Sequence, residues 1–123
     1  MLALLALMPK NTAGNDTIKT SMDDPELYLT QNRSITEVLL AENPLIECLI
    51  RYESGGNPNA VGDSGRAYGI LQFWQSTFNL YAEEYGLEGL VYEDPESQII
   101  LAYEMLKRNP ANVGNWTAAK YCD

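Results

Sequence analysis

Apolar residues along this chain recur at helical spacing, in short segments that turn-forming residues separate. The first segment follows Ser34-Ile35-Thr36-Glu37, where Ser and Glu have the Ser-x-x-Glu form of a capping box that opens a helix. The second follows Asn43-Pro44, an N-cap with proline at the first helical position, and runs to about Ser54 before Gly55-Gly56 ends it. Its apolar residues follow helical spacing: Leu45, Ile46, Leu49 and Ile50.

Two further helices are predicted downstream by the same kind of signal. One begins at Ser76 or Thr77 and stops at Gly86. The other begins after Asp94-Pro95, a second cap-then-proline signal, and stops at Asn109-Pro110. Its apolar face consists of Ile99, Ala102, Tyr103 and Leu106.

The segment 57–73, between the second and third predicted helices, is dense in turn formers. Its centre reads Gly62-Asp63-Ser64-Gly65, which predicts an irregular or hairpin-like β insertion. A last short helix is expected at about residues 116–121, and no internal repeat is visible. The sequence therefore predicts a mainly α fold: a small helical domain with one short irregular β-hairpin-like insertion.

The N-terminal segment differs from the rest of the chain in composition. Residues 1–8 are apolar and rich in Ala and Leu, as the core of an export signal is, but no basic residues precede them. A short apolar tail that packs on the domain is the alternative. Residues 9–33 are rich in Asn, Thr, Asp and Ser, which indicates a flexible arm. We therefore expect an apolar segment and arm over residues 1–33 and one compact domain over residues 34–123.

Charge and composition limit the chemistry of that domain. The chain has 8 Lys and Arg against 17 Asp and Glu, and its net charge of -9 argues against nucleic-acid partners. The absence of histidine excludes Ser-His-Asp and Cys-His catalysis and imidazole zinc sites. Acid–base chemistry near neutral pH then falls to a carboxyl group of raised pKa, or to Lys, Tyr or Cys. We expect no metal, no cofactor, no stable membrane insertion and a monomer.

Cys48 and Cys122 are the only cysteines, so a single pairing exists. One lies on the second predicted helix and the other almost at the end of the chain. A bridge would close a long loop and stabilise the fold by roughly 2–4 kcal/mol in an oxidising compartment. Two buried thiols are the alternative, and mass measurement with and without reductant separates the two.

Glu53 is the main candidate for acid–base chemistry. It ends the second predicted helix together with Ser54 and precedes, after a turn, the glycine-containing block Gly65-Arg66-Ala67-Tyr68-Gly69-Ile70-Leu71-Gln72. A helix C-terminus and apolar neighbours raise the pKa of a carboxyl group, which keeps it protonated for use as a general acid. A solvated acid near a helix end is the alternative for Glu53.

In combination and order, these motifs resemble the soluble lytic transglycosylase (SLT) family of the lysozyme-like superfamily. The matching motifs over about residues 43–122 are Glu53-Ser54, then Asn57-Pro58-Asn59-Ala60-Val61, then the block 65–72, with Thr77 shortly after it. The block has one residue more between its first two glycines than the family pattern. Many SLT domains also carry an Ala-Tyr-Asn-Ala-Gly motif near the C-terminal end, and residues 113–121 lack it.

The resemblance implies a lysozyme-like fold and peptidoglycan glycan strands as the substrate. In SLT enzymes a single Glu, here Glu53, is first the acid on the bond between N-acetylmuramic acid and N-acetylglucosamine. It is then the base on the muramyl 6-hydroxyl, which gives a 1,6-anhydro product. The resemblance also implies export to the periplasm, cell wall or extracellular space. The expected glycan contacts are Ser54, Tyr68, Gly69, Gln72 and Tyr103.

Each of these contacts has a structural alternative. For Ser54, which is expected to contact the glycan or to orient Glu53, the alternative is a residue that only helps to end the helix. For Gln72 the alternative is a strand residue whose amide bonds to the backbone. Most tyrosines in a chain with 8 of them belong to the core or to ordinary surface. Trp116 is expected to pack near the bridge instead of binding sugar.

A looser resemblance connects the chain to animal-type lysozymes. Cys48, five residues before Glu53, and Cys122, after Trp116, fall as a bridging pair does in that branch, which favours the disulfide. In that branch an Asp precedes the Tyr-Gly-Ile-Leu-Gln motif, whereas here Ala67 does. The two-carboxylate mechanism of that branch therefore lacks its partner here.

Asp63 is the nearby acid that would restore a pair of carboxyl groups. As a water-activating base it would make the protein a hydrolytic muramidase, although an Asp in this position most often stabilises a turn. A third alternative is a protein that binds cell-wall glycan without cleaving it, since a fold alone does not fix function.

Overall fold

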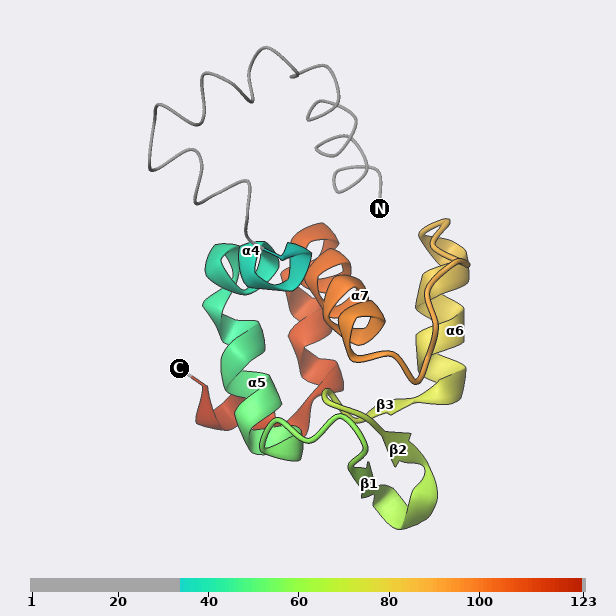
Figure 1. The fold of residues 1–123 in the computed structure, drawn as a ribbon. Coiled ribbons are helices and arrows are strands. Elements are labelled where there is room, and N and C mark those ends of the chain that lie inside the picture. Colours follow the sequence, from blue (N-terminus) through green and yellow to red (C-terminus); the bar gives the residue numbers. More distant parts are fainter. Residues whose placement is uncertain (1–33, 123) are drawn as a thin grey trace.

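The computed structural model describes residues 34–122, and Figure 1 shows the arrangement of their helices and strands. The helices are α4 (Ile35–Glu42), α5 (Pro44–Ser54), α6 (Gln75–Glu84) and α7 (Pro95–Arg108). The strands are β1 (Val61–Gly62), β2 (Ala67–Tyr68) and β3 (Phe73–Trp74). Three short 3₁₀ helices are η1 (Asp63–Gly65), η2 (Pro110–Asn115) and η3 (Thr117–Tyr121). The prediction of a mainly α domain with a short β insertion is confirmed.

Local signals start and end the first helices where the sequence predicts. Ser34 and Glu37 form a reciprocal capping box at the start of α4. The side chains of Asn43 and Asp94 accept hydrogen bonds from backbone N–H groups in the first turns of α5 and α7. Gly55 ends α5 in the left-handed conformation, with φ of 63°.

Two elements differ from the sequence-based expectation. The start of α6 is Gln75, earlier than Ser76 or Thr77, and its N-cap Trp74 makes no side-chain capping bond that would mark this end. The last short helix, expected at about residues 116–121, is the 3₁₀ helix η3, whereas the 3₁₀ helix η2 before it was not predicted. The side chain of Asn109 accepts from the N–H of Ala111, so the signal that stops α7 also starts η2.

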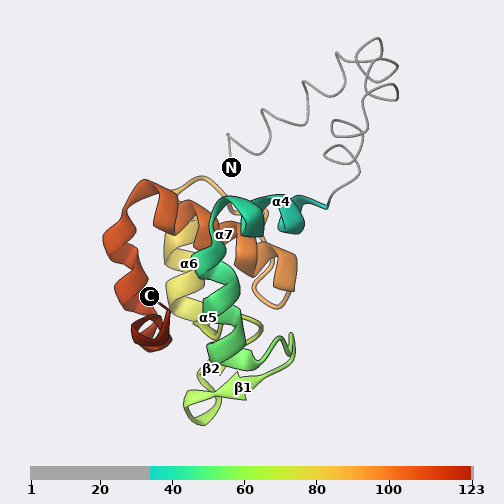
Figure 2. The same ribbon diagram turned by 90° about the vertical axis from the view of Figure 1, so that its left-hand side faces the viewer.

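The insertion is an antiparallel sheet in the order β1-β2-β3. Its register pairs Val61 with Tyr68 and Ala67 with Trp74. Figures 1 and 2 show β1 and β2 below the C-terminal end of α5. Strands of two residues have little stability of their own, so the rest of the domain must hold this sheet in place.

Gln98 of α7 supplies much of that support. It is fully buried, and its Oε1 accepts from the N–H of Leu71 at 3.0 Å. Its Nε2 donates to the carbonyl oxygens of Tyr68 at 3.0 Å and Tyr92 at 2.8 Å. A Cβ on Gly69 would lie 2.3 Å from that Nε2, so glycine is required at this position for Gln98 to reach the sheet.

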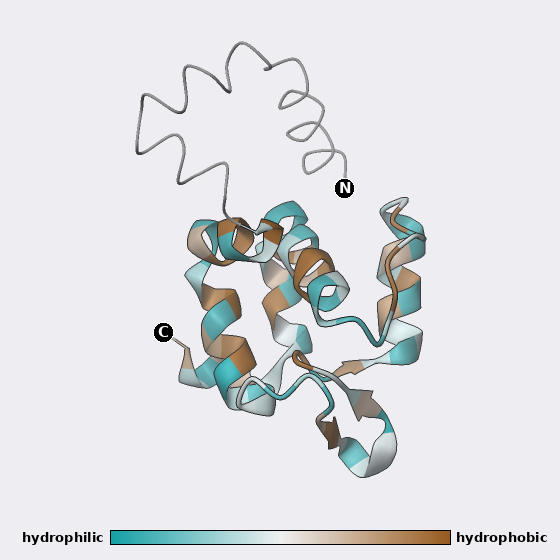
Figure 3. Ribbon diagram, viewed as in Figure 1, coloured by the Kyte–Doolittle hydropathy of each residue, from teal (hydrophilic) through white to brown (hydrophobic). Residues whose placement is uncertain are grey.

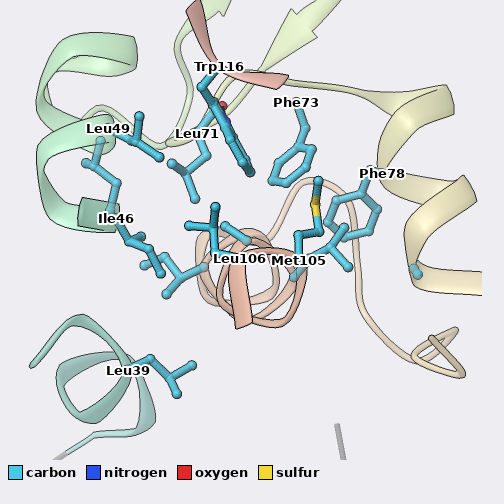
Figure 4. Packing of buried hydrophobic residues seen from close by; sticks show 14 of the residues in the cluster. Leu39, Ile46, Leu49, Leu71, Phe73, Phe78, Met105, Leu106 and Trp116 are labelled. Carbon is cyan, nitrogen blue, oxygen red and sulfur yellow. Dashed lines mark hydrogen bonds between the residues drawn. The ribbon is translucent and has the colours of Figure 1, made fainter. Parts of the chain in front are cut away.

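The core lies between the sheet and helices α4, α5, α6 and α7, as the buried side chains in Figure 4 show. The ring of Phe73 packs edge-on against Phe78 and Trp116, with both pairs of centroids 5.5 Å apart. Trp116 is 4% exposed and its indole N–H donates to the carbonyl oxygen of Leu71. Along the helices in Figure 3, hydrophobic and hydrophilic positions alternate as expected for helices with one buried face.

A disulfide joins Cys48 on α5 to Cys122 after η3, with Cα atoms 5.8 Å apart. The C-terminal segment is thereby attached to the helix that carries Glu53. Within residues 34–122, no helix combines the length and the apolar character needed to cross a bilayer.

Candidate active site

A cavity of about 300 Å³ lies where the end of α5 meets the sheet and the C-terminal segment. Its polar lining comes from three parts of the chain: Glu53, then Asp63, Gln72 and Thr77, and then Asn115 and Thr117. Phe73, Trp74 and Trp116 add aromatic surface. A concave site with convergent carboxyl, amide, hydroxyl and aromatic groups suits a polar ligand with apolar faces, such as a sugar.

Glu53 lies on the last turn of α5 and is partly buried. Burial raises the pKa of its carboxyl group, the backbone N–H of Ala118 donates to it and lowers the pKa in part, and the charge of Asp63 raises it again. The net direction is upward. Glu53 therefore stays protonated to a higher pH than an ordinary glutamate does, which is the property a general acid needs.

Asp63 lines the same cavity from η1. Its Oδ2 accepts a hydrogen bond of 2.9 Å from the indole N–H of Trp74. Asp63 and Ser64 both have left-handed backbones, with φ of 52° and 59°. Residues other than glycine rarely adopt this conformation, although Asp tolerates it better than most. The structure thus brings the two acids, Glu53 and Asp63, to one cavity.

Gln72 also lines the cavity, but its amide is held by the protein itself. Its Nε2 donates to the carbonyl oxygens of Ala60 at 3.0 Å and Gly69 at 2.9 Å. Its backbone is left-handed, with φ of 53°, and its Oε1 would lie 2.3 Å from a Cβ placed on Gly62. Gln72 therefore shapes this wall of the cavity and keeps the turn before it closed.

Ser54 and Gly69 are not among the residues that line the cavity. The hydroxyl of Ser54 donates to the carbonyl oxygen of Ile70 at 2.7 Å and accepts from the N–H of Gly56 at 3.1 Å. Ser54 thus joins the end of α5 to the block 65–72. Gly69, with φ of 93°, makes room for Gln98.

The two predicted tyrosines lie elsewhere. Tyr68 donates its hydroxyl to Asn59 at 3.0 Å, and its ring lies 6.0 Å from that of Tyr92, in a second cavity. Tyr103 lies between α7 and α4, where its hydroxyl donates to the carboxylate of Glu42. This hydrogen bond, together with burial, raises the pKa of Tyr103 to about 12. Neither tyrosine lines the cavity that contains Glu53.

Several lining residues were not identified from the sequence. Trp74 is 40% exposed and lies two residues after the block 65–72, and an exposed aromatic residue so close to that block was the available sequence signal. Asn115 and Thr117 carry no motif, since residues 113–121 depart from the family pattern. Only the fold of the C-terminal segment brings them to Glu53.

Within residues 34–122, no three side chains of His, Cys, Asp or Glu are grouped to hold a metal ion.

Comparison with known proteins identifies the family of this domain. The model of the transglycosylase SLT domain matches residues 34–121, from the capping box of α4 to the residue before Cys122. No curated protein and no solved structure shows a significant match. The family match confirms the resemblance seen in the sequence. Because the match spans most of the chain, this protein belongs to the transglycosylase SLT domain family, whose activity is the degradation of peptidoglycan.

Proposed function

We propose that the protein is a lytic transglycosylase that cleaves the β-1,4 bond between N-acetylmuramic acid and N-acetylglucosamine, with Glu53 as its single catalytic acid and base. One observation carries the proposal. Glu53 is a partly buried carboxyl group of raised pKa in a cavity with polar and aromatic walls, inside a domain of the SLT family. A glutamate that only stands near a helix end would be exposed to solvent, because burying its carboxyl group costs free energy without a functional return.

In the first step, protonated Glu53 gives its proton to the glycosidic oxygen. The bond from that oxygen to C1 of the muramyl residue breaks, and N-acetylglucosamine leaves with a free 4-hydroxyl. In the second step, the Glu53 carboxylate takes the proton of the muramyl 6-hydroxyl, and the 6-oxygen bonds to C1. The product is a 1,6-anhydro ring, Glu53 is protonated again, and no water is consumed.

The surroundings of Glu53 suit a group that both gives and takes a proton. Burial and the charge of Asp63 favour the protonated form needed for the first step. The N–H of Ala118 favours the carboxylate that is present between the steps. The net direction of these influences favours the protonated form.

One observation supports a second candidate, a hydrolytic muramidase. Asp63 lines the same cavity, and its charge reaches Glu53. A second carboxylate is what an enzyme needs to activate water or to stabilise the reaction centre. Its Oδ2 is engaged with the indole N–H of Trp74, which leaves Oδ1 for such a role.

Mass spectrometry of the products released from peptidoglycan sacculi tests the proposal. The wild type is compared with Glu53→Gln, which keeps the shape of the side chain, and with Asp63→Asn. Anhydromuramyl products, lighter by one water than reducing-end products, that disappear in Glu53→Gln support the transglycosylase. Reducing-end products that need Asp63 support the muramidase. If the wild type binds sacculi and releases nothing, the protein is a glycan-binding member of the family.

We further propose that the protein acts outside the cytoplasm, in the periplasm, cell wall or extracellular space. The substrate of the family is there, and the Cys48–Cys122 bridge is of a kind that persists in oxidising compartments. We also propose residues 34–123 as one monomeric catalytic domain, with residues 1–33 as a separate N-terminal segment.

A further inference from the structure

A second cavity, of about 580 Å³, adjoins the one that contains Glu53. The two share the side chain of Trp74, which lines both. The second cavity is further lined by two aromatic and two charged side chains, those of Tyr68, Tyr92, Arg66 and Glu93. A ligand in the second cavity would therefore contact Trp74, which also lines the cavity that contains Glu53.

The turn 62–66 fixes Trp74 from two directions. Asp63 accepts the hydrogen bond of the indole N–H at 2.9 Å, and the guanidinium carbon of Arg66 lies 5.4 Å from the centre of the ring. Stacking on an aromatic face is a common way of positioning a guanidinium without using its N–H donors. Arg66 therefore keeps those donors for a ligand in the second cavity.

The charges in the second cavity define the ligand that it suits. Neither Arg66 nor Glu93 forms an ion pair with another of the residues 34–122. The planar guanidinium of Arg66 matches a carboxylate in a bidentate geometry. The carboxylate of Glu93 matches an ammonium group. Together with the aromatic walls, these groups fit a short peptide that carries both a free carboxylate and a free amine.

We propose that the second cavity binds the peptide stem of the muramyl residue next to the bond that is cleaved, with Arg66 on a stem carboxylate and Glu93 on a stem amine. This proposal rests on the proposed function, because the stem is part of that substrate. The stem branches from the muramyl residue itself, so it starts beside the reaction centre and reaches past Trp74. The cavity then makes the protein selective for glycan strands that still carry peptides.

Cleavage of two matched substrates tests this selectivity. One is glycan strands with intact peptide stems, and the other is the same strands after an amidase has removed the stems. Arg66→Gln and Glu93→Gln should each lower kcat/KM about tenfold on the first substrate, through KM, as expected for the loss of one charge-assisted hydrogen bond. On bare strands both should stay near the wild type. Lys107→Gln, which removes an exposed charge on α7 beside Tyr103, is the control and should cleave both substrates normally.

An equal loss on both substrates would overturn the proposal, since the cavity would then serve the sugar chain or only hold Trp74. Unchanged cleavage of the peptide-bearing strands would overturn it as well. A binding experiment separates this proposal from the proposed function, because it needs no turnover. Calorimetry with Glu53→Gln should show tighter binding of a disaccharide with a peptide stem than of the bare disaccharide, and adding Arg66→Gln should remove the difference. Equal binding of the two disaccharides would exclude the stem site even if cleavage is absent.

Discussion

The carboxyl group of Glu53 accepts a hydrogen bond from the backbone N–H of Ala118, which lies near the opposite end of the described chain. Ala118 belongs to η3, and η3 leads directly to Cys122, which is bonded to Cys48 on the same helix as Glu53. The proposed catalytic residue and its backbone partner are therefore held together at two points, the hydrogen bond and the disulfide.

Glu53→Gln should abolish most of the cleavage. A general acid contributes roughly 10²- to 10⁴-fold to such a reaction, and the amide cannot donate a proton to the leaving oxygen. Release of soluble muropeptides from sacculi measures the effect, and circular dichroism checks that the fold is retained. Cleavage within about threefold of the wild type would assign the acid to another residue.

The raised pKa of Glu53 should change the pH dependence of both activity and stability. Its raised pKa should extend activity to a higher pH than an ordinary glutamate allows, and the alkaline limb of the kcat profile should report it. In Asp63→Asn the repulsion from Asp63 is lost, the pKa of Glu53 falls, and this limb should move to lower pH. A limb that stays in place would show that it belongs to another group.

The raised pKa of Glu53 also determines how the free energy of unfolding depends on pH. An acid whose pKa is higher in the folded state is more easily ionised when unfolded, so folding is favoured below its unfolded-state pKa. That contribution is lost as the pH rises through the raised pKa. Glu53→Gln should therefore lower the free energy of unfolding less at neutral pH than in acid, or should increase it at neutral pH. Urea unfolding at two pH values, with Glu47→Gln as the control on the same helix, measures this difference.

Removal of the disulfide should affect stability and activity together. Cys48→Ser with Cys122→Ser should lower the free energy of unfolding by roughly 2–4 kcal/mol. Because η3 carries Ala118 and Thr117, cleavage should fall more than the unfolded fraction explains. Denaturant unfolding and sacculus cleavage, each with and without reductant, provide the test. The wild type in reductant should behave as the double variant does, and a double variant of full activity would show that η3 keeps its place without the bridge.

Gly69→Ala should destabilise the sheet. The added Cβ would lie 2.3 Å from Nε2 of Gln98, and φ of 93° is strained for alanine. The free energy of unfolding should fall by about 1–3 kcal/mol, because of backbone strain and broken hydrogen bonds. Gly89→Ala is the matched control, because nothing lies within 4 Å of its Cβ position. Thermal unfolding of both variants gives the comparison, and equal melting temperatures would contradict the role of Gln98.

Tyr103→Phe should leave cleavage within about twofold of the wild type. The hydroxyl donates to Glu42 between α4 and α7, so its removal should cost about 0.5–1.5 kcal/mol of stability instead. A strong loss of cleavage with little loss of stability would place Tyr103 in contact with the glycan, as the family resemblance implies.

Much of the fold could be predicted from the sequence because its signals are local. Ser34, Asn43 and Asp94 cap their helices with side chains close to the backbone groups that they bind, so a few consecutive letters contain the information. Gly55 ends α5 for the same reason. The start of α6 lacks a capping side chain, and there the boundary was misplaced.

The same distinction between local sequence signals and long-range packing applies to the candidate site. The sequence by itself identified Glu53 as the acid to consider, the SLT family and the single pairing of two cysteines, because motif and composition are properties of the chain. Only the tertiary structure decided which residues share a cavity with Glu53. It brought in Trp74, Asn115 and Thr117 and moved Ser54 and Tyr103 to other contacts. The physical reason is that a cavity wall depends on how distant segments pack, and Gln98 and the disulfide fix that packing through contacts far apart in the sequence.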